Sequence, residues 1–552
     1  MPAFRKLAIS STALAAIWAG GWSYACDNCE KISASAPAVI LPNVTAVQHP
    51  ITTANPLAQQ FFDQGLTLVY GFNHDEAIRS FKKAAELDPD CAMAWWGVAL
   101  ALGPNYNMDV TPETELAAFQ AIQKALKLKE KVSQPERDYI DALAVRYSDA
   151  AEPDLKQLAR DYATAMRKLH VAYPDDADAA TLYADALMNL RPWKLWNRDG
   201  TPAEGTLEII SVLESVLSRD PNHAGANHLY IHAVEASPNP DRALPSADRL
   251  TRISPGSGHL VHMPSHIYFL VGEYNRSALV NEEAIRVDDA YFRTRSRDGA
   301  YGMMYYNHNT HFAAISHAWQ GKQGAARFYA GKLHDDVLPQ IKMMPPLEQF
   351  ATIRGLVDLH FADWRAILET PRPPAELKIA TALWHFNRAM ALSATGKPEQ
   401  ALEEQALFAA ARKDVPPDSP YGMVNVAGDA LQIADHLLSA RFAEAAGDAA
   451  SAESHLRQAV QIQDRLNYEE PEPWPISVRQ NLGGVLLRAG RAAEAEKAFR
   501  DDLKKYPRHG RSLFGLWQAL EKQGRSHEAG LVRRQFEDAW KYADIKLSVE
   551  QL

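Results

Sequence analysis

The chain has little cysteine, no excess of positive charge and no long apolar run beyond its N-terminal segment. Only 3 of its 552 residues are cysteine, so disulfide bonds do not build the fold. The 58 Lys and Arg residues against 68 Asp and Glu give a net charge of -10, which argues against a nucleic-acid partner. No later stretch approaches the roughly 20 apolar residues of a membrane-spanning helix. Glycine-rich phosphate loops, GxSxG and HExxH motifs are also absent from the sequence.

An export signal is predicted for residues 1–25. A basic pair precedes an apolar run too short for a membrane span, and Ser23 and Ala25 are small residues at the two positions that a signal peptidase reads. We expect the mature chain to begin near Cys26 and to be periplasmic or secreted. Three roles are open for Cys26 and Cys29. The two cysteines form a small disulfide loop, they have a redox or metal-binding role, or Cys26 carries a lipid.

Residues recur along the chain with a period of 34, as between Gly490 and Gly524. The tetratricopeptide pattern has this period, with a turn glycine, a small residue five positions later, an apolar residue four further on, and a closing proline. Gly490, Ala495, Phe499 and Pro507 fit this pattern. Further copies are marked by Ala77, Phe81, Ala84, Pro89, Gly396, Ala401, Gly447 and Ala452. The chain therefore resembles the tetratricopeptide repeat family over nearly its whole mature length, as an exported member of bacterial type.

The resemblance implies an all-α fold without a sheet. Antiparallel helix pairs would stack into a right-handed superhelical solenoid, whose concave wall is lined mainly by the first helix of each pair. We expect the following organisation: an extended N-terminal segment (26–54), N-terminal repeats (55–190), histidine-rich repeats with insertions (191–345) and C-terminal repeats (346–545).

The stretch from His228 to His311 holds seven histidines that the register set by glycine, alanine and proline turns inward. These residues are His228, His232, His259, His262, His266, His308 and His311. Two pairs, His228 with His232 and His262 with His266, are four residues apart. That spacing places two imidazoles on one helical face, where both reach a single ion, and neighbouring helices lie about 8–10 Å apart. The pattern predicts a metal site that bridges repeats.

The ligand types point to copper first, with zinc or non-haem iron as alternatives. No cysteine lies nearby, and Glu235 is the one obvious inward carboxylate. A catalytic zinc needs three protein ligands, so seven histidines mean that some orient others or that more than one ion binds. Glu235 is a ligand, an orienting group or a catalytic general base. Pro264 lies in mid-helix between two of the histidines, where it removes a hydrogen bond and kinks the chain. Such violations tend to lie at functional sites.

Two hypotheses follow. The first is an exported metalloprotein. It is an enzyme that oxidises a small molecule or peptide with copper or hydrolyses it with zinc, or it is a metal carrier without catalysis. Trp193 and Trp196, in an insertion, would then form a substrate-binding rim over the groove, although a plain core-capping loop explains them equally well. The second hypothesis is a non-catalytic scaffold that binds an exported peptide or protein, with its histidines as polar groove contacts.

Overall fold

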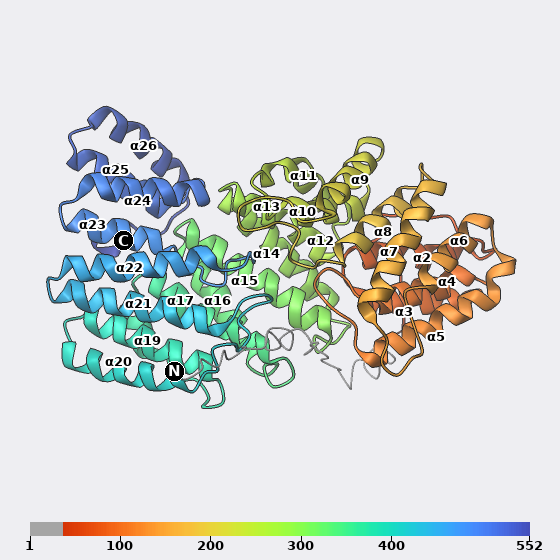
Figure 1. Cartoon of the computed structure of the whole chain (residues 1–552), viewed down its shortest axis with the longest axis horizontal. Coiled ribbons are helices and arrows are strands. Elements are labelled where there is room, and N and C mark those ends of the chain that lie inside the picture. Colours follow the sequence, from red (N-terminus) through yellow and green to blue (C-terminus); the bar gives the residue numbers. More distant parts are fainter. Residues whose placement is uncertain (1–36) are drawn as a thin grey trace, which may run out of the picture.

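The computed structural model describes residues 37–552, and this part of the chain is a solenoid of antiparallel helix pairs (Figure 1). It contains no β-strand, only three isolated bridges. The prediction of an all-α repeat fold is therefore confirmed. No helix within residues 37–552 combines the length and the apolarity that a membrane crossing requires. The predicted export signal, Cys26 and Cys29 lie outside the described residues.

The helices follow one another with short connections. The first part of the chain forms α2 (Pro56–Tyr70), α3 (His74–Leu87), α4 (Ala92–Leu102), α5 (Pro112–Leu128), α6 (Gln134–Ala144), α7 (Leu155–Ala172), α8 (Ala177–Met188) and α9 (Thr206–Arg219). The histidine-rich part forms α10 (Ala224–Val234), α11 (Leu244–Ile253), α12 (Gly258–His262), α13 (Pro264–Leu270), α14 (Tyr274–Tyr291), α15 (Asn307–Trp319) and α16 (Gln323–Val337).

The last part of the chain continues in the same way. It forms α17 (Glu348–His360), α18 (Trp364–Glu369), α19 (Lys378–Ala394), α20 (Pro398–Lys413), α21 (Ala427–Ala445), α22 (Ala449–Arg465), α23 (Val478–Arg488), α24 (Ala492–Lys505), α25 (Gly510–Lys522) and α26 (Ser526–Ala539). Short 3-10 turns occur at Lys129–Lys131, Pro240–Ala243, Pro345–Leu347 and Val549–Gln551, and a π-helical turn at Tyr301–Tyr306 leads into α15.

Glycine turns set the register of the histidine-rich repeats. Gly272 joins α13 to α14 with φ 80°, and Gly321 joins α15 to α16 with φ 78°. This left-handed conformation costs glycine little and other residues more. The helices of these repeats begin at Ala224, Gly258 and Asn307, which are the starts that the sequence markers predict.

Pro264 divides one helix of the array into α12 and α13. Proline has no backbone N–H to donate within a helix, and its ring crowds the preceding turn. The helix therefore ends at His262 and restarts at Pro264, and the His266 N–H donates to the Met263 carbonyl over 3.2 Å, three residues back. The break lies between two predicted metal ligands.

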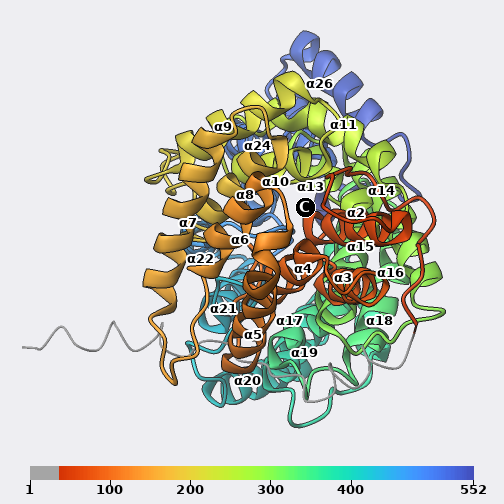
Figure 2. The same ribbon diagram turned by 90° about the vertical axis from the view of Figure 1, so that its right-hand side faces the viewer.

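The superhelix curls until distant repeats meet, so that its interior is covered. The N-terminal helices α2 to α6 face the viewer in Figure 2, and the segment that follows α14 reaches α3. There, Arg295 donates to the Glu76 carboxylate, and both side chains are buried. At the other end, the Tyr274 hydroxyl donates to the Pro507 carbonyl over 3.0 Å. The concave wall predicted from the sequence is therefore not an open groove at the histidines.

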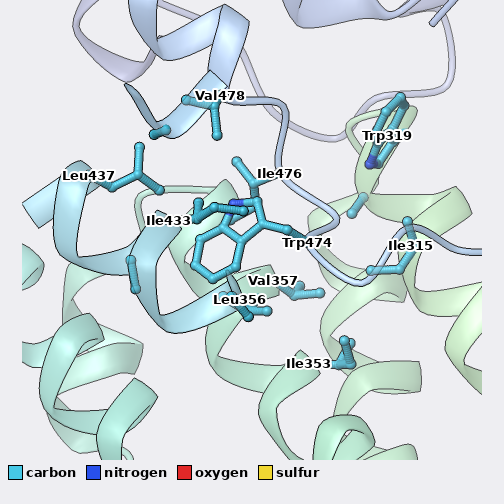
Figure 3. Packing of buried hydrophobic residues seen from close by; sticks show 14 of the residues in the cluster. Ile315, Trp319, Ile353, Leu356, Val357, Ile433, Leu437, Trp474, Ile476 and Val478 are labelled. Atoms are coloured by element: carbon cyan, nitrogen blue, oxygen red, sulfur yellow. The ribbon is translucent and has the colours of Figure 1, made fainter. Parts of the chain in front are cut away.

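The connection between α22 and α23 fills the inside of the C-terminal repeats. Trp474 of this segment is fully buried, and its indole points among apolar side chains that include Ile433 and Leu356 (Figure 3). Packing of this large side chain fixes the path of residues 466–477. The segment brings Glu470 to the histidine-rich repeats.

Candidate metal centre

Six of the seven predicted histidines converge in the interior of the molecule. Helix α10 supplies two of them, α12 two, α13 one and α15 one. We call them the histidine cluster: His228, His232, His259, His262, His266 and His308. Neighbouring rings have centroids 4.7–5.6 Å apart. Five of the six side chains are at most 2% exposed, and the sixth is partly exposed.

The ring nitrogens of the cluster fall into two sets of three, each within 4.8 Å. The first triad is His228, His232 and His259, and the second triad is His262, His266 and His308. In the second triad, the His266 Nε2 atom lies 3.0 Å from Nε2 of His262 and 3.4 Å from Nε2 of His308. Nitrogen ligands about 2.0–2.1 Å from a tetrahedral ion lie about 3.3 Å from one another. Both distances from Nε2 of His266 are thus close to the spacing of ligands around one ion.

The hydrogen bonds at Nδ1 assign the protons of the second triad. Nδ1 of His262 donates to the Asn281 side-chain oxygen over 2.6 Å, and the Asn281 amide nitrogen donates to the Ser277 carbonyl over 2.7 Å, which fixes the orientation of that amide. Nδ1 of His266 donates to Glu235 over 2.7 Å. Both Nε2 atoms therefore carry lone pairs, and these lone pairs face each other across 3.0 Å with no proton between them.

The first triad is oriented in the same way at two of its three rings. Nδ1 of His228 donates to the Tyr70 carbonyl over 2.5 Å, and Nδ1 of His232 donates to Glu235 over 2.9 Å. Their Nε2 atoms and both ring nitrogens of His259 are buried without a hydrogen-bond partner. Glu235 accepts from one histidine of each triad, through Oε1 and Oε2 respectively.

Burial sets the charge state of the site. It lowers the pKa well below the ordinary histidine value at four of the rings: His228, His259, His262 and His308. Neutral imidazole is the form that binds a metal ion. Burial alone would raise the pKa of Glu235, but the imidazoles of His232 and His266 outweigh it and lower that pKa to about 2. The Glu235 carboxylate is therefore ionised at neutral pH.

Glu470 is a second carboxyl group at the cluster, and sequence reasoning did not find it. It lies in the segment between α22 and α23, and its Oε2 atom is 3.3 Å from Nδ1 of His266. Burial, and then the neighbouring Glu235, raise the pKa of Glu470 well above its usual range. No repeat marker points to this linker residue, and only the closing of the superhelix brings it here.

An aromatic side chain from the first repeat covers the first triad. The Phe72 ring lies 4.5 Å from that of His228, 6.0 Å from that of His232 and 5.4 Å from that of His259. Tyr305, at the end of the π-helical turn, lies 4.7 Å from His259. The first triad is therefore enclosed by side chains from repeats far apart in sequence.

The two predicted rim tryptophans lie beside the cluster without touching its rings. Trp193 stacks on Tyr106 with centroids 5.5 Å apart, and Tyr106 lies 5.0 Å from His232. Trp196 donates from its indole nitrogen to the Ala233 carbonyl over 2.8 Å, which fastens the insertion to α10. The insertion covers this side of the site.

His311 is the predicted ligand that the structure does not bring into the cluster. It lies about one turn further along α15 than His308, so its ring packs against Phe350 of α17, with centroids 5.2 Å apart. Burial lowers its pKa to about 3. His317, which the register places at a packing position, pairs with Glu282 over 2.8 Å.

Comparisons with known proteins identify the repeats. A family model of the tetratricopeptide repeat matches residues 62–103 and 481–542. No curated protein sequence matches the chain. Similar solved structures include human IFIT1 with PPP-AAAA, at 12% identity and a TM-score of 0.32 over 93% of this chain and 94% of that one. Yeast Tom70 has 11% identity and a TM-score of 0.29 over 88% and 93%. Scores this low carry no ligand or activity over to this chain.

Proposed function

The chain is a tetratricopeptide-repeat protein, and we propose that it uses the repeat scaffold to hold a transition-metal ion in the second triad. This proposal rests on the Nε2 atoms of His262 and His266, whose lone pairs face each other across 3.0 Å. An unpartnered buried polar group costs about 1–3 kcal/mol. A cation between the two nitrogens removes this cost and turns the repulsion into ligation.

The donor set favours copper, then zinc. The second triad offers three neutral nitrogen ligands and leaves a coordination position open. Cys91, the free cysteine of the described residues, is buried among the N-terminal repeats. Both oxygens of Glu235 accept from imidazoles, so this carboxylate orients the histidines rather than binding the metal. A non-haem iron site of two histidines and one carboxylate fits this arrangement less well.

Metal content of the purified protein tests the proposal. The wild type, produced through its export route with added copper or zinc, is expected to carry at least one ion per chain. His262→Ala/His266→Ala should lose that ion and keep its helical circular dichroism spectrum. His317→Ala is the matched control, because His317 is a buried histidine of α15 outside the cluster. Equal metal in wild type and double variant, or none in either, would refute the proposal.

A repeat scaffold that binds a peptide or protein is the second candidate function. Family membership favours this scaffold over a metalloenzyme, because repeats of this kind stack into extended binding surfaces. The histidine cluster would contribute little to such binding, since its side chains face the interior. Protein that stays free of metal under the conditions above supports this candidate.

Export is part of either proposal. N-terminal sequencing of the major soluble form should return a chain that starts near Cys26. A sequence that starts at Met1 would contradict export.

A further inference from the structure

Several ring nitrogens of the first triad are buried without a hydrogen-bond partner. Nε2 of His228, Nε2 of His232 and both ring nitrogens of His259 lack a hydrogen-bond partner, although all three side chains are at most 2% exposed. Buried polar atoms in native proteins are almost always paired. Four unpaired atoms of one chemical type in one place point to a ligand that accepts lone pairs.

The lone pairs of this triad are fixed by groups that can only accept. Nδ1 of His228 faces the Tyr70 carbonyl, and Nδ1 of His232 faces one carboxylate oxygen of Glu235, whose other oxygen accepts from His266. Both Nδ1 atoms therefore carry the proton, and both Nε2 atoms are free donors of an electron pair. Together with a nitrogen of His259, they lie within 4.8 Å of one another.

We propose that the first triad binds a second transition-metal ion, so that the histidine cluster is a binuclear centre with three imidazoles for each ion. This inference rests on the proposed function, because the second triad holds the other ion. Glu235 ties the two halves together, since Oε1 accepts from His232 and Oε2 from His266. One carboxylate thereby fixes a ligand of each ion.

The charge of the site assigns the pair to copper in its lower oxidation state. Two divalent ions would bring four positive charges to a buried site whose nearby carboxyl groups are Glu235 and Glu470. Two copper(I) ions bring only two charges, so less positive charge is left unbalanced in the buried site. Unbalanced charge is costly to bury, and imidazole is a suitable ligand for copper.

The two sites should differ in affinity. In the second triad, Nε2 of His266 lies 3.0 Å from Nε2 of His262 and 3.4 Å from Nε2 of His308, which is close to the spacing of ligands around one ion. In the first triad, His259 has no hydrogen-bond partner at either nitrogen, so no hydrogen bond selects its tautomer before the ion arrives. Loss of such an orienting hydrogen bond weakens metal binding about 10- to 100-fold. The second triad therefore fills first.

Stoichiometry decides the inference. Metal-free full-length protein is titrated with copper(I) under anaerobic, reducing conditions against a competing chelator. The wild type should bind two ions, the second about 10- to 100-fold more weakly. His259→Gln should bind one ion with the affinity of the tighter site, and His308→Gln should lose the tighter site. His317→Gln is the control and should bind two.

The outcomes separate this inference from the proposed function. A single ion in the wild type overturns the binuclear centre and leaves the proposed function standing, whereas no bound ion overturns both. The wild-type count decides even if a variant fails to fold. The same titration with Zn²⁺ should saturate at one ion, and two bound zinc ions would overturn the assignment to copper.

Discussion

At the scale of single residues, the metal proposal depends on acceptors that orient the imidazoles. Asn281 accepts from Nδ1 of His262 and so turns the Nε2 lone pair toward the second triad. We predict that Asn281→Leu weakens metal binding about 10- to 100-fold while the helical fold remains. Asn281→Asp keeps an oxygen at the same position and should bind nearly as the wild type does. If competition with a chelator gives the same metal affinity for Asn281→Leu as for the wild type, Asn281 does not orient His262 as proposed.

A second residue-scale prediction concerns pH and lies outside the cluster. His49 donates to Asp178 over 2.8 Å. Burial alone would lower the pKa of His49, but Asp178, then Asp176 and Asp63, outweigh it and raise that pKa. A raised pKa stabilises the fold below the ordinary histidine pKa of about 6.5, and this stabilisation is lost as the pH rises through the raised value. The melting temperature of wild type should therefore exceed that of His49→Gln by more at pH 6 than at pH 9. A pH-independent difference would rule out this pair.

Sequence reasoning identified the histidines of the cluster and Glu235, but not the other groups that orient the imidazoles. Helical register predicts which side chains share a face of a helix, and this was enough to identify six of the seven histidines as neighbours in the structure. Asn281, the Tyr70 carbonyl and Glu470 act on the same rings from other elements. The carbonyl leaves no signature in the sequence. His311 shares the predicted face but lies beyond the second triad, against Phe350.

At the scale of elements, the insertion that contains Trp193 acts as a cover rather than as part of the repeat. Trp193 stacks on Tyr106, which in turn contacts His232. We predict that Trp193→Ala lets a chelator extract the metal several-fold faster while the number of bound ions stays the same. Trp384→Ala removes a tryptophan of the C-terminal repeats and should leave the rate unchanged. Equal extraction rates for Trp193→Ala and wild type would show that the insertion does not limit access.

The helix pairs themselves were predictable because their turns carry local signals. Gly272 and Gly321 adopt positive φ, which favours glycine, and Pro264 cannot continue a helix. These signals place the helix starts of the histidine-rich repeats correctly. They say nothing of the angle between successive pairs, which accumulates over many repeats and depends on side-chain packing between them.

At the scale of the whole molecule, that accumulated angle changes what the concave wall does. The sequence predicts a concave groove, and the superhelix curls until Phe72 of the first repeat covers the first triad and Glu470 of the C-terminal repeats reaches the second. Three distant parts of the chain therefore meet at the histidine cluster. An ion bound there would hold these parts together.

This convergence leads to a prediction for the stability of the whole chain. An ion that binds only the folded state, present at a thousand times its dissociation constant, stabilises that state by about 4 kcal/mol. Metal-loaded protein should therefore melt at a higher temperature than chelator-treated protein. Residues 70–74 and 466–477 should also resist proteolysis better when metal is bound, because both segments pack on the cluster. His228→Ala/His232→Ala/His262→Ala/His266→Ala removes ligands of both triads, so it provides the control and should respond to neither metal nor chelator. Identical melting and cleavage of the wild type in both states would mean that the cluster does not link these repeats through a metal ion.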